Sequence, residues 1–194
     1  MKFIKSILRR SLTPTFLVLI TLSFAITATA QQRDHLTDPE TDLVRFYQEL
    51  DKRTDVFIKA ADRRFAIING SAQPATKKLM KDEPEWGELP KGTHVQLLGD
   101  IAGILDEAIT NIDNVSSRDP KNPLLTRSLR KLTNAANGYL TQLTALRTRT
   151  TNADELEAIE RIADEAKEII EASGHLPSGA VEDDQSKDKK KKKP

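Results

Sequence analysis

Three features of this 194-residue chain predict an all-α fold, an antiparallel four-helix bundle. Apolar residues recur three and four positions apart in four long segments, which is the period of an amphipathic helix. These segments begin with capping residues and end at glycine, proline or polar breaks. No segment alternates β-branched and polar residues over the length of a strand, so we expect no sheet.

The first thirty residues resemble an export signal in their composition. A basic start is followed by the apolar run Phe16 to Ile26 and by Ala28-Thr29-Ala30, the small-residue pattern after which signal peptidase cleaves. The mature chain is therefore expected to begin at Gln31, in the periplasm or outside the cell. The apolar run is shorter than the ~20 residues that a transmembrane helix needs, so we expect no membrane span after cleavage. Retention of the leader as an anchor is the alternative.

Residues 31–177 have the size of one domain and can bury a hydrophobic core. The formal charge of the whole chain is +1, and the four basic residues of the leader leave the mature form at −3. This balance argues against a nucleic-acid partner. The chain contains no cysteine, which excludes disulfides, thiolate metal sites and covalent haem attachment through a C-x-x-C-H motif. Packing must hold the domain together.

The first helix is expected to begin at Asp38, which can cap it, with Pro39 at the first helical position and Glu40 in the first turn. It is predicted to run unbroken to Asn69-Gly70. Its apolar stripe consists of Leu43, Tyr47, Leu50, Phe57, Ile58, Ala61, Phe65 and Ile68.

The second helix is expected to begin after Thr93, which can form a capping box with Gln96, and to end before the polar run 116–120. Its stripe consists of Val95, Leu98, Ala102, Leu105, Ile109 and Ile112. Because only a short turn follows, the second and third helices are expected to be antiparallel neighbours, as are the third and fourth.

The third helix is predicted to start at Asn122-Pro123, and the fourth to open with a capping box between Asn152 and Glu155 and to end at Gly174. The third carries an unbroken four-and-three seam of the coiled-coil type. Its members are Leu125, Leu129, Leu132, Ala136, Tyr139, Leu143 and Leu146. The stripe of the fourth helix consists of Leu156, Ile159, Ala163, Ala166 and Ile170.

Two segments outside the helices have a distinct composition. Residues 70–92 form a long, proline-containing connection, with a short helix expected near Lys77–Lys81. Residues 178–194 contain almost no apolar side chain and are predicted to be a disordered tail. The tail ends in a lysine run: Lys189, Lys190, Lys191, Lys192 and Lys193. Such a run is attracted to anionic envelope surfaces, although a solubilising tail without a partner is the alternative.

The sequence assigns no catalytic residue, no metal ligand and no cofactor. The histidines, His35, His94 and His175, lie at helix ends, and no glutamate has a histidine three residues later, as a di-iron bundle requires. The fourth helix carries a series of carboxylates, Glu157, Glu160, Asp164, Glu168 and Glu171. Because Arg161 and Lys167 are interleaved with this series, we interpret it as a solvated face.

Four residues have more than one interpretation. Gly99, Gly103 and Gly138 lie inside predicted helices, where each costs about 1 kcal/mol relative to alanine. Such glycines allow another element to approach closely or leave room for a ligand. Trp86 lies in the long connection and either folds over the core or serves as an exposed docking anchor.

These observations favour an exported, non-enzymatic binding or interaction protein of the cell envelope or exterior. Its partner would be an anionic envelope surface or another protein, with Trp86 and the lysine run as candidate contacts. A carrier of haem or another small ligand is the first alternative, with Met80 and His94 as the candidate axial ligands. A hydrolytic enzyme is the second, although no carboxylate pair can be selected by its spacing.

Overall fold

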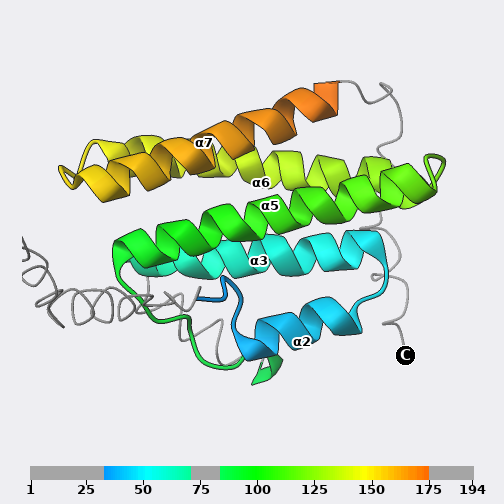
Figure 1. Cartoon of the computed structure of the whole chain (residues 1–194), viewed down its shortest axis with the longest axis horizontal. Coiled ribbons are helices and arrows are strands. Elements are labelled where there is room, and N and C mark those ends of the chain that lie inside the picture. The colour runs from blue at the N-terminus through cyan, green and yellow to red at the C-terminus, as the bar shows by residue number, and fades with distance from the viewer. Residues whose placement is uncertain (1–32, 71–83, 175–194) are drawn as a thin grey trace, which may run out of the picture. The chain divides into compact units, whose positions relative to one another are not determined.

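A computed structural model describes residues 33–70 and 84–174. Every regular element within these two ranges is helical, which confirms the all-α prediction for this part of the chain (Figure 1). None of the described helices is both long and apolar enough to cross a membrane. The leader, the expected helix at Lys77–Lys81, Met80, His175 and the lysine-rich tail lie outside the described residues.

Five α-helices and one short 3-10 helix make up the described chain. They are α2 (Asp38–Phe46), α3 (Leu50–Ile68), η2 (Pro84–Trp86), α5 (His94–Arg118), α6 (Pro123–Arg147) and α7 (Ala153–Gly174). The four long helices lie side by side, and the shorter α2 lies along α3 (Figure 1).

The order of packing around the core differs from the order in the sequence. Helices α3 and α7 each pack against both α5 and α6, whereas α5 and α6 contact each other little and α3 does not pack against α7. We expected α5 and α6 to be neighbours because a short turn joins them. They instead lie diagonally opposite, since α5 has apolar residues on two sides and α3 and α7 cover both.

The buried residues of α5 form a broader face than the predicted stripe. The apolar ones are Leu97, Leu98, Ile101, Ala102, Ile104, Leu105, Ala108 and Ile112. On α6 the predicted seam is confirmed from Leu132 to Leu146, and Tyr139 stacks on Phe65 of α3 with ring centroids 4.9 Å apart. On α7 the buried positions are Ile159, Ile162, Ala166 and Ile169, so Ile162 and Ile169 are buried in place of the predicted Ala163 and Ile170.

The predicted helix starts are mostly confirmed. Thr93 and Gln96 form a reciprocal capping box, and the Asn122 side chain accepts from the backbone N–H of Leu124 at 2.9 Å. The Asn152 side chain caps α7, but Glu155 does not return to Asn152: its carboxylate accepts the Thr150 hydroxyl. The N-cap of α2 is Thr37, one residue before the expected Asp38.

The prediction of one unbroken helix from Asp38 to Ile68 is wrong, because the chain breaks after Phe46 and restarts at Leu50. In a continuous helix Glu40 and Arg63 would lie about 35 Å apart, at 1.5 Å per residue. After the break α2 folds back along α3, and the Arg63 Nη1 to Glu40 Oε1 distance is 2.7 Å. The break has no glycine or proline, so we attribute it to tertiary contacts that outweigh local helix propensity.

Candidate functional site

An exposed aromatic pair marks the break between α2 and α3. Phe46 is 76% exposed and Tyr47 36%, and they are the large hydrophobic residues of the described chain that reach solvent to this extent. Their rings meet edge to face with centroids 5.1 Å apart. We call Phe46 and Tyr47 the aromatic corner. Because the two rings are in contact, they form contiguous exposed apolar surface, the feature that marks interaction sites on packed proteins.

Hydrogen bonds hold the backbone of the aromatic corner in place. The Tyr47 N–H donates to the Leu43 carbonyl at 3.0 Å, which closes the end of α2. The Arg53 guanidinium donates from Nε to the Tyr47 carbonyl and from Nη1 to Asn111 Oδ1 of α5, both at 3.0 Å. The corner is therefore fixed to α3 and, through α3, to α5.

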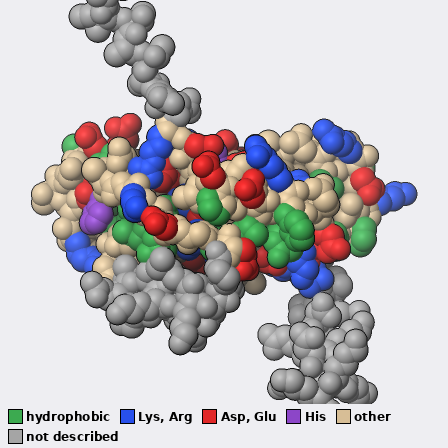
Figure 2. Space-filling view, turned by 90° about the horizontal axis from the view of Figure 1, so that it is seen from below, with side chains coloured by type: hydrophobic (Ala, Val, Ile, Leu, Met, Phe, Trp, Pro, Cys, Tyr) green, Lys and Arg blue, Asp and Glu red, His purple; other side chains and the backbone are tan. Residues whose placement is uncertain are grey.

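Basic residues outnumber acidic ones in two chain segments at this end of the helices. Residues 45–53 and 118–131, which we call the basic end, contain eight basic and three acidic residues. The basic ones are Arg45, Lys52, Arg53, Arg118, Lys121, Arg127, Arg130 and Lys131. Helix α7 has the opposite balance, with eight acidic and two basic residues. Figure 2 shows the side of the molecule that carries α2, where hydrophobic side chains reach the surface among basic and acidic ones.

Contacts join the two parts of the basic end. Arg127 and Lys131 of α6 reach the buried Asp51 of α3, with nitrogen to oxygen distances of 3.4 and 3.6 Å. Lys131 also pairs with Asp55 at 2.7 Å. The start of α3, the end of α5 and the start of α6 therefore meet at one end of the helical body. Helix α7 runs back toward this end, and Gly174 is its last residue (Figure 1).

A buried ionic cluster fixes the other end of α2. Glu40 is 0% exposed, and its carboxylate accepts from Arg63 at 2.7 Å and from Arg64 at 2.8 and 3.0 Å. Asp100 of α5 lies 3.6 Å from Arg64 Nε. We call these four residues the ionic cluster. Burial would raise the pKa of Glu40, but its hydrogen bonds and the nearby arginine charges outweigh that cost and lower the pKa below 4.5.

The ionic cluster also holds the chain segments on either side of it. Arg64 Nη2 donates to the His35 carbonyl at 2.6 Å, and Arg63 Nη2 donates to the carbonyls of Gly87 and Glu88 at 3.2 and 2.6 Å. Trp86 is 8% exposed and lies under Lys59, whose Nζ is 4.5 Å from the ring centroid. Of its two interpretations, packing over the core is the one that matches this burial.

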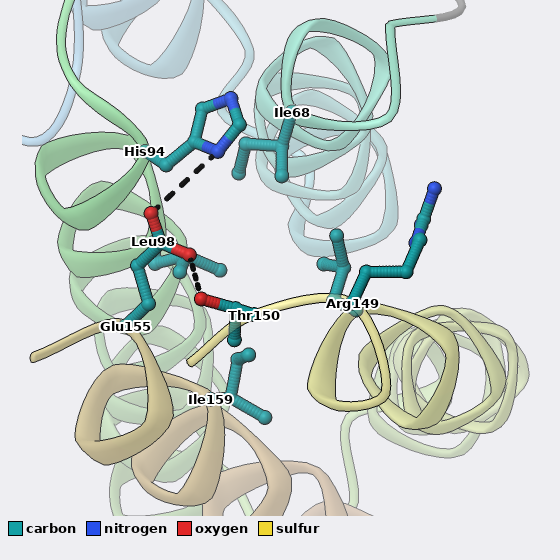
Figure 3. A pocket seen from close by; sticks show the side chains of 8 residues that line it. Ile68, His94, Leu98, Arg149, Thr150, Glu155 and Ile159 are labelled. Atoms are coloured by element: carbon teal, nitrogen blue, oxygen red, sulfur yellow. Dashed lines mark hydrogen bonds and ion pairs between the residues drawn. The ribbon is translucent and has the colours of Figure 1, made fainter. Parts of the chain in front are cut away.

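A small pocket lies at the opposite end of the long helices, lined by four apolar residues and by His94, Arg149, Thr150 and Glu155 (Figure 3). Its volume is about 250 Å³. The His94 ring nitrogen Nδ1 lies 3.7 Å from the Glu155 carboxylate, while the Arg149 guanidinium points away from this pair. His94 was the candidate axial ligand, and the structure places it at the mouth of this pocket.

The three helical glycines have different surroundings. A Cβ on Gly103 would lie 2.9 Å from Cγ of His35, so Gly103 allows this segment to approach α5 closely. A Cβ on Gly99 or Gly138 would meet nothing within 4 Å. Gly138 lines a shallow groove of about 400 Å³ between α3 and α6.

The carboxylate series of α7 is exposed at all five positions, as the interpretation of a solvated face requires. Lys167 pairs with Asp164 at 2.8 Å, and Arg147 of α6 pairs with Glu160. Within residues 33–70 and 84–174 no group of three histidine or acidic side chains is placed to hold a metal ion.

Comparisons with known proteins give no match: no family model fits the chain, and no characterised protein or solved structure is significantly similar to it. The site must therefore be judged from its geometry. Sequence reasoning missed the aromatic corner because it placed Tyr47 on a buried stripe. It missed the ionic cluster because Arg63 and Arg64 belong to a polar stretch of α3 and nothing nearby in the sequence signals their partner.

Proposed function

We propose that this protein is an exported, non-enzymatic interaction module, an antiparallel four-helix bundle that attaches to an anionic surface of the cell envelope. The observation that carries the proposal is the excess of basic residues in the basic end, where residues 45–53 and 118–131 contain eight basic and three acidic residues. Such an excess of positive charge attracts anionic surfaces to this part of the molecule.

Two features of the sequence support the same surface as the partner. The first is the expected leader, which would deliver the chain to the envelope. The second is the lysine run of the tail, Lys189 to Lys193, in the sequence that follows Gly174. Near an anionic surface each basic residue contributes about 1 kcal/mol, so the tail and the basic end together would act as one electrostatic anchor.

The test starts with export of the full chain from a bacterium under its own leader. Mass spectrometry should find a mature form that begins at Gln31 outside the cytoplasm. This form should sediment with vesicles of phosphatidylglycerol but not with those of phosphatidylcholine, and ~1 M salt should release it, because the Debye length then falls to about 3 Å. Equal binding to both vesicle types, or no binding, would refute the proposal.

The pocket at His94 favours a second candidate function, the carriage of a small ligand. Its apolar floor and its polar mouth could hold the apolar body and the polar group of a small molecule. An absorbance spectrum of the purified protein tests the haem form of this idea, since a Soret band would be direct evidence for it.

A further inference from the structure

We infer that the aromatic corner is the element that enters the membrane: Phe46 inserts into the interface of an anionic phospholipid bilayer while the basic end binds the head groups. This inference rests on the proposed function and narrows it to one lipid surface and one part of the molecule. Three properties of the corner support it, namely its exposure, its rigidity and its surroundings.

Exposure and rigidity make the corner suitable for insertion. Phe46 is the last residue of α2, and at 76% exposure most of its surface is available to a partner. The rings of Phe46 and Tyr47 pack edge to face, and the hydrogen bond from Arg53 to the Tyr47 carbonyl holds the backbone that carries them. A side chain presented on a braced backbone enters an interface with little loss of conformational entropy.

The surroundings select a lipid surface over a protein groove. Interfacial anchors combine aromatic residues, which lie at the level of the head groups, with flanking lysine and arginine, which bind anionic lipids. Arg45 and Lys52 lie near the corner in its own chain segment, together with Asp42 and Glu49, and Arg118 and Lys121 lie at the same end of the long helices, at the α5–α6 turn. In the sequence, the lysine run follows α7.

The experiment compares variants of the exported full-length form in sedimentation with phosphatidylglycerol vesicles. Phe46→Ser should weaken binding about tenfold or more, since it removes the apolar area that the bilayer would bury. Its melting temperature should not change, because the side chain is exposed. Phe46→Trp should keep the affinity, and its emission should shift to the blue and be quenched by brominated lipids.

Two double variants separate the position of charge from its amount. Arg118→Gln with Lys121→Gln removes two positive charges from the basic end and should weaken binding about tenfold. Arg161→Gln with Lys167→Gln removes the same charge from α7, where both side chains are exposed, and should leave binding within about twofold of the wild type. We leave Arg127 unchanged because it contacts the buried Asp51.

Each other outcome overturns the inference in a distinct way. If Phe46→Ser binds like the wild type, the corner does not insert and the proposed function stands without it. Equal losses in the two double variants mean attraction by net charge without a docking end. If the wild type forms a dimer that Phe46→Ser abolishes, and vesicle binding is unaffected, the corner binds a second copy of the chain. If the wild type does not bind the vesicles, both the inference and the proposed function fail.

Discussion

The two ends of α2 lie within nine residues of each other and have opposite environments. At the first turn Glu40 is fully buried between two arginines, whereas at the last turn Phe46 is 76% exposed. Charged groups are normally found outside and aromatic groups inside. This reversal shows that an apolar stripe alone does not hold α2 in place. The ionic cluster at the first turn fixes the position of the helix, and so fixes where the aromatic corner at its last turn is exposed.

The ionic cluster determines the position of α2 more than it adds to the free energy of unfolding. A buried ion pair often gains little over well-packed apolar residues, because desolvation offsets the attraction between the charges. The ionic cluster nevertheless accepts only one arrangement, since Glu40 binds both arginines and these also bind the carbonyls of His35, Gly87 and Glu88. We therefore expect substitutions in the ionic cluster to lower the free energy of unfolding strongly, and substitutions at the aromatic corner to leave it nearly unchanged.

The largest effect should come from breaking the ionic cluster itself. Glu40→Gln leaves Arg63 and Arg64 buried without a carboxylate, and we expect it to lower the free energy of unfolding by about 3–5 kcal/mol. Chemical denaturation measures this loss. The matched control is Asp42→Asn on the same helix, where an exposed carboxylate lies 3.7 Å from Arg45 and the cost should stay within about 0.5 kcal/mol. Similar losses in the two variants would show that α2 is not locked by Glu40.

The second effect tests the apolar core beneath both ends. Leu132 and Leu143 are 0% and 2% exposed, so truncation of either to alanine should cost about 2–5 kcal/mol. Gln142→Ala is the control and should cost much less, because it loses only a hydrogen bond from Asn69. Lys131 is a poor control, since it reaches the buried Asp51. Thermal melts that rank Gln142→Ala with the leucine variants would place the buried face of α6 elsewhere.

The residues in these two predictions also differ in whether the sequence revealed their role. Leu132 and Leu143 were assigned to the core from their spacing, and the starts of α5 and α6 from their caps, because both signals are local. In the ionic cluster Glu40 binds arginines 23 and 24 positions further along the chain, and no local pattern specifies such contacts. The break after Phe46 follows from that contact, so it could not be predicted either.

Hydrophobic periodicity also predicted the buried residues better for a helix that packs on one side than for a helix that packs on two. On α6 a single seam faces the core, and the prediction is confirmed from Leu132 onward. On α5 the helix is covered by both α3 and α7, so Leu97, Ile101 and Ile104 are buried as well. The denser set of apolar residues in this segment indicated that α5 is covered on two sides. The prediction assigned only one stripe to the core and therefore left out the second side.

The third effect tests the close approach of the His35 segment to α5. Gly103→Ala would bring the new Cβ within about 3 Å of His35, and overpacking of this kind costs about 1–3 kcal/mol. Gly138→Ala should instead stabilise the protein by about 0.5–1 kcal/mol, because its surroundings are open and alanine favours the helix. Denaturation curves should shift in opposite directions. Stabilisation by both substitutions would mean that the His35 segment is not held against α5.

The smallest effect concerns His35, whose carbonyl is bound by Arg64 of the ionic cluster. Its side chain forms a hydrogen bond of 2.8 Å between Nε2 and Glu107 of α5. The hydrogen bond to Glu107 raises the pKa of His35 above 6.5, and the charges of Glu107 and Asp34 add to it, while burial and Arg64 oppose it. A raised pKa in the folded state stabilises the protein while histidine is protonated in both states, below its unfolded pKa of 6.5. The contribution is lost as the pH rises through the folded-state pKa.

His35→Gln should therefore destabilise the protein at acidic pH and have little effect at alkaline pH. Because the pair is partly exposed, the difference from the wild type should be a few tenths to about 1 kcal/mol. Urea unfolding between about pH 5.5 and 8.5 measures it, and the difference should shrink as the pH rises above the unfolded pKa. His94→Gln is the control at the other end of the helices, where the imidazole is 53% exposed and 3.7 Å from Glu155, and its effect should be smaller. A loss in His35→Gln that is constant over this range would show that His35 holds its segment by packing, without a contribution from its charge.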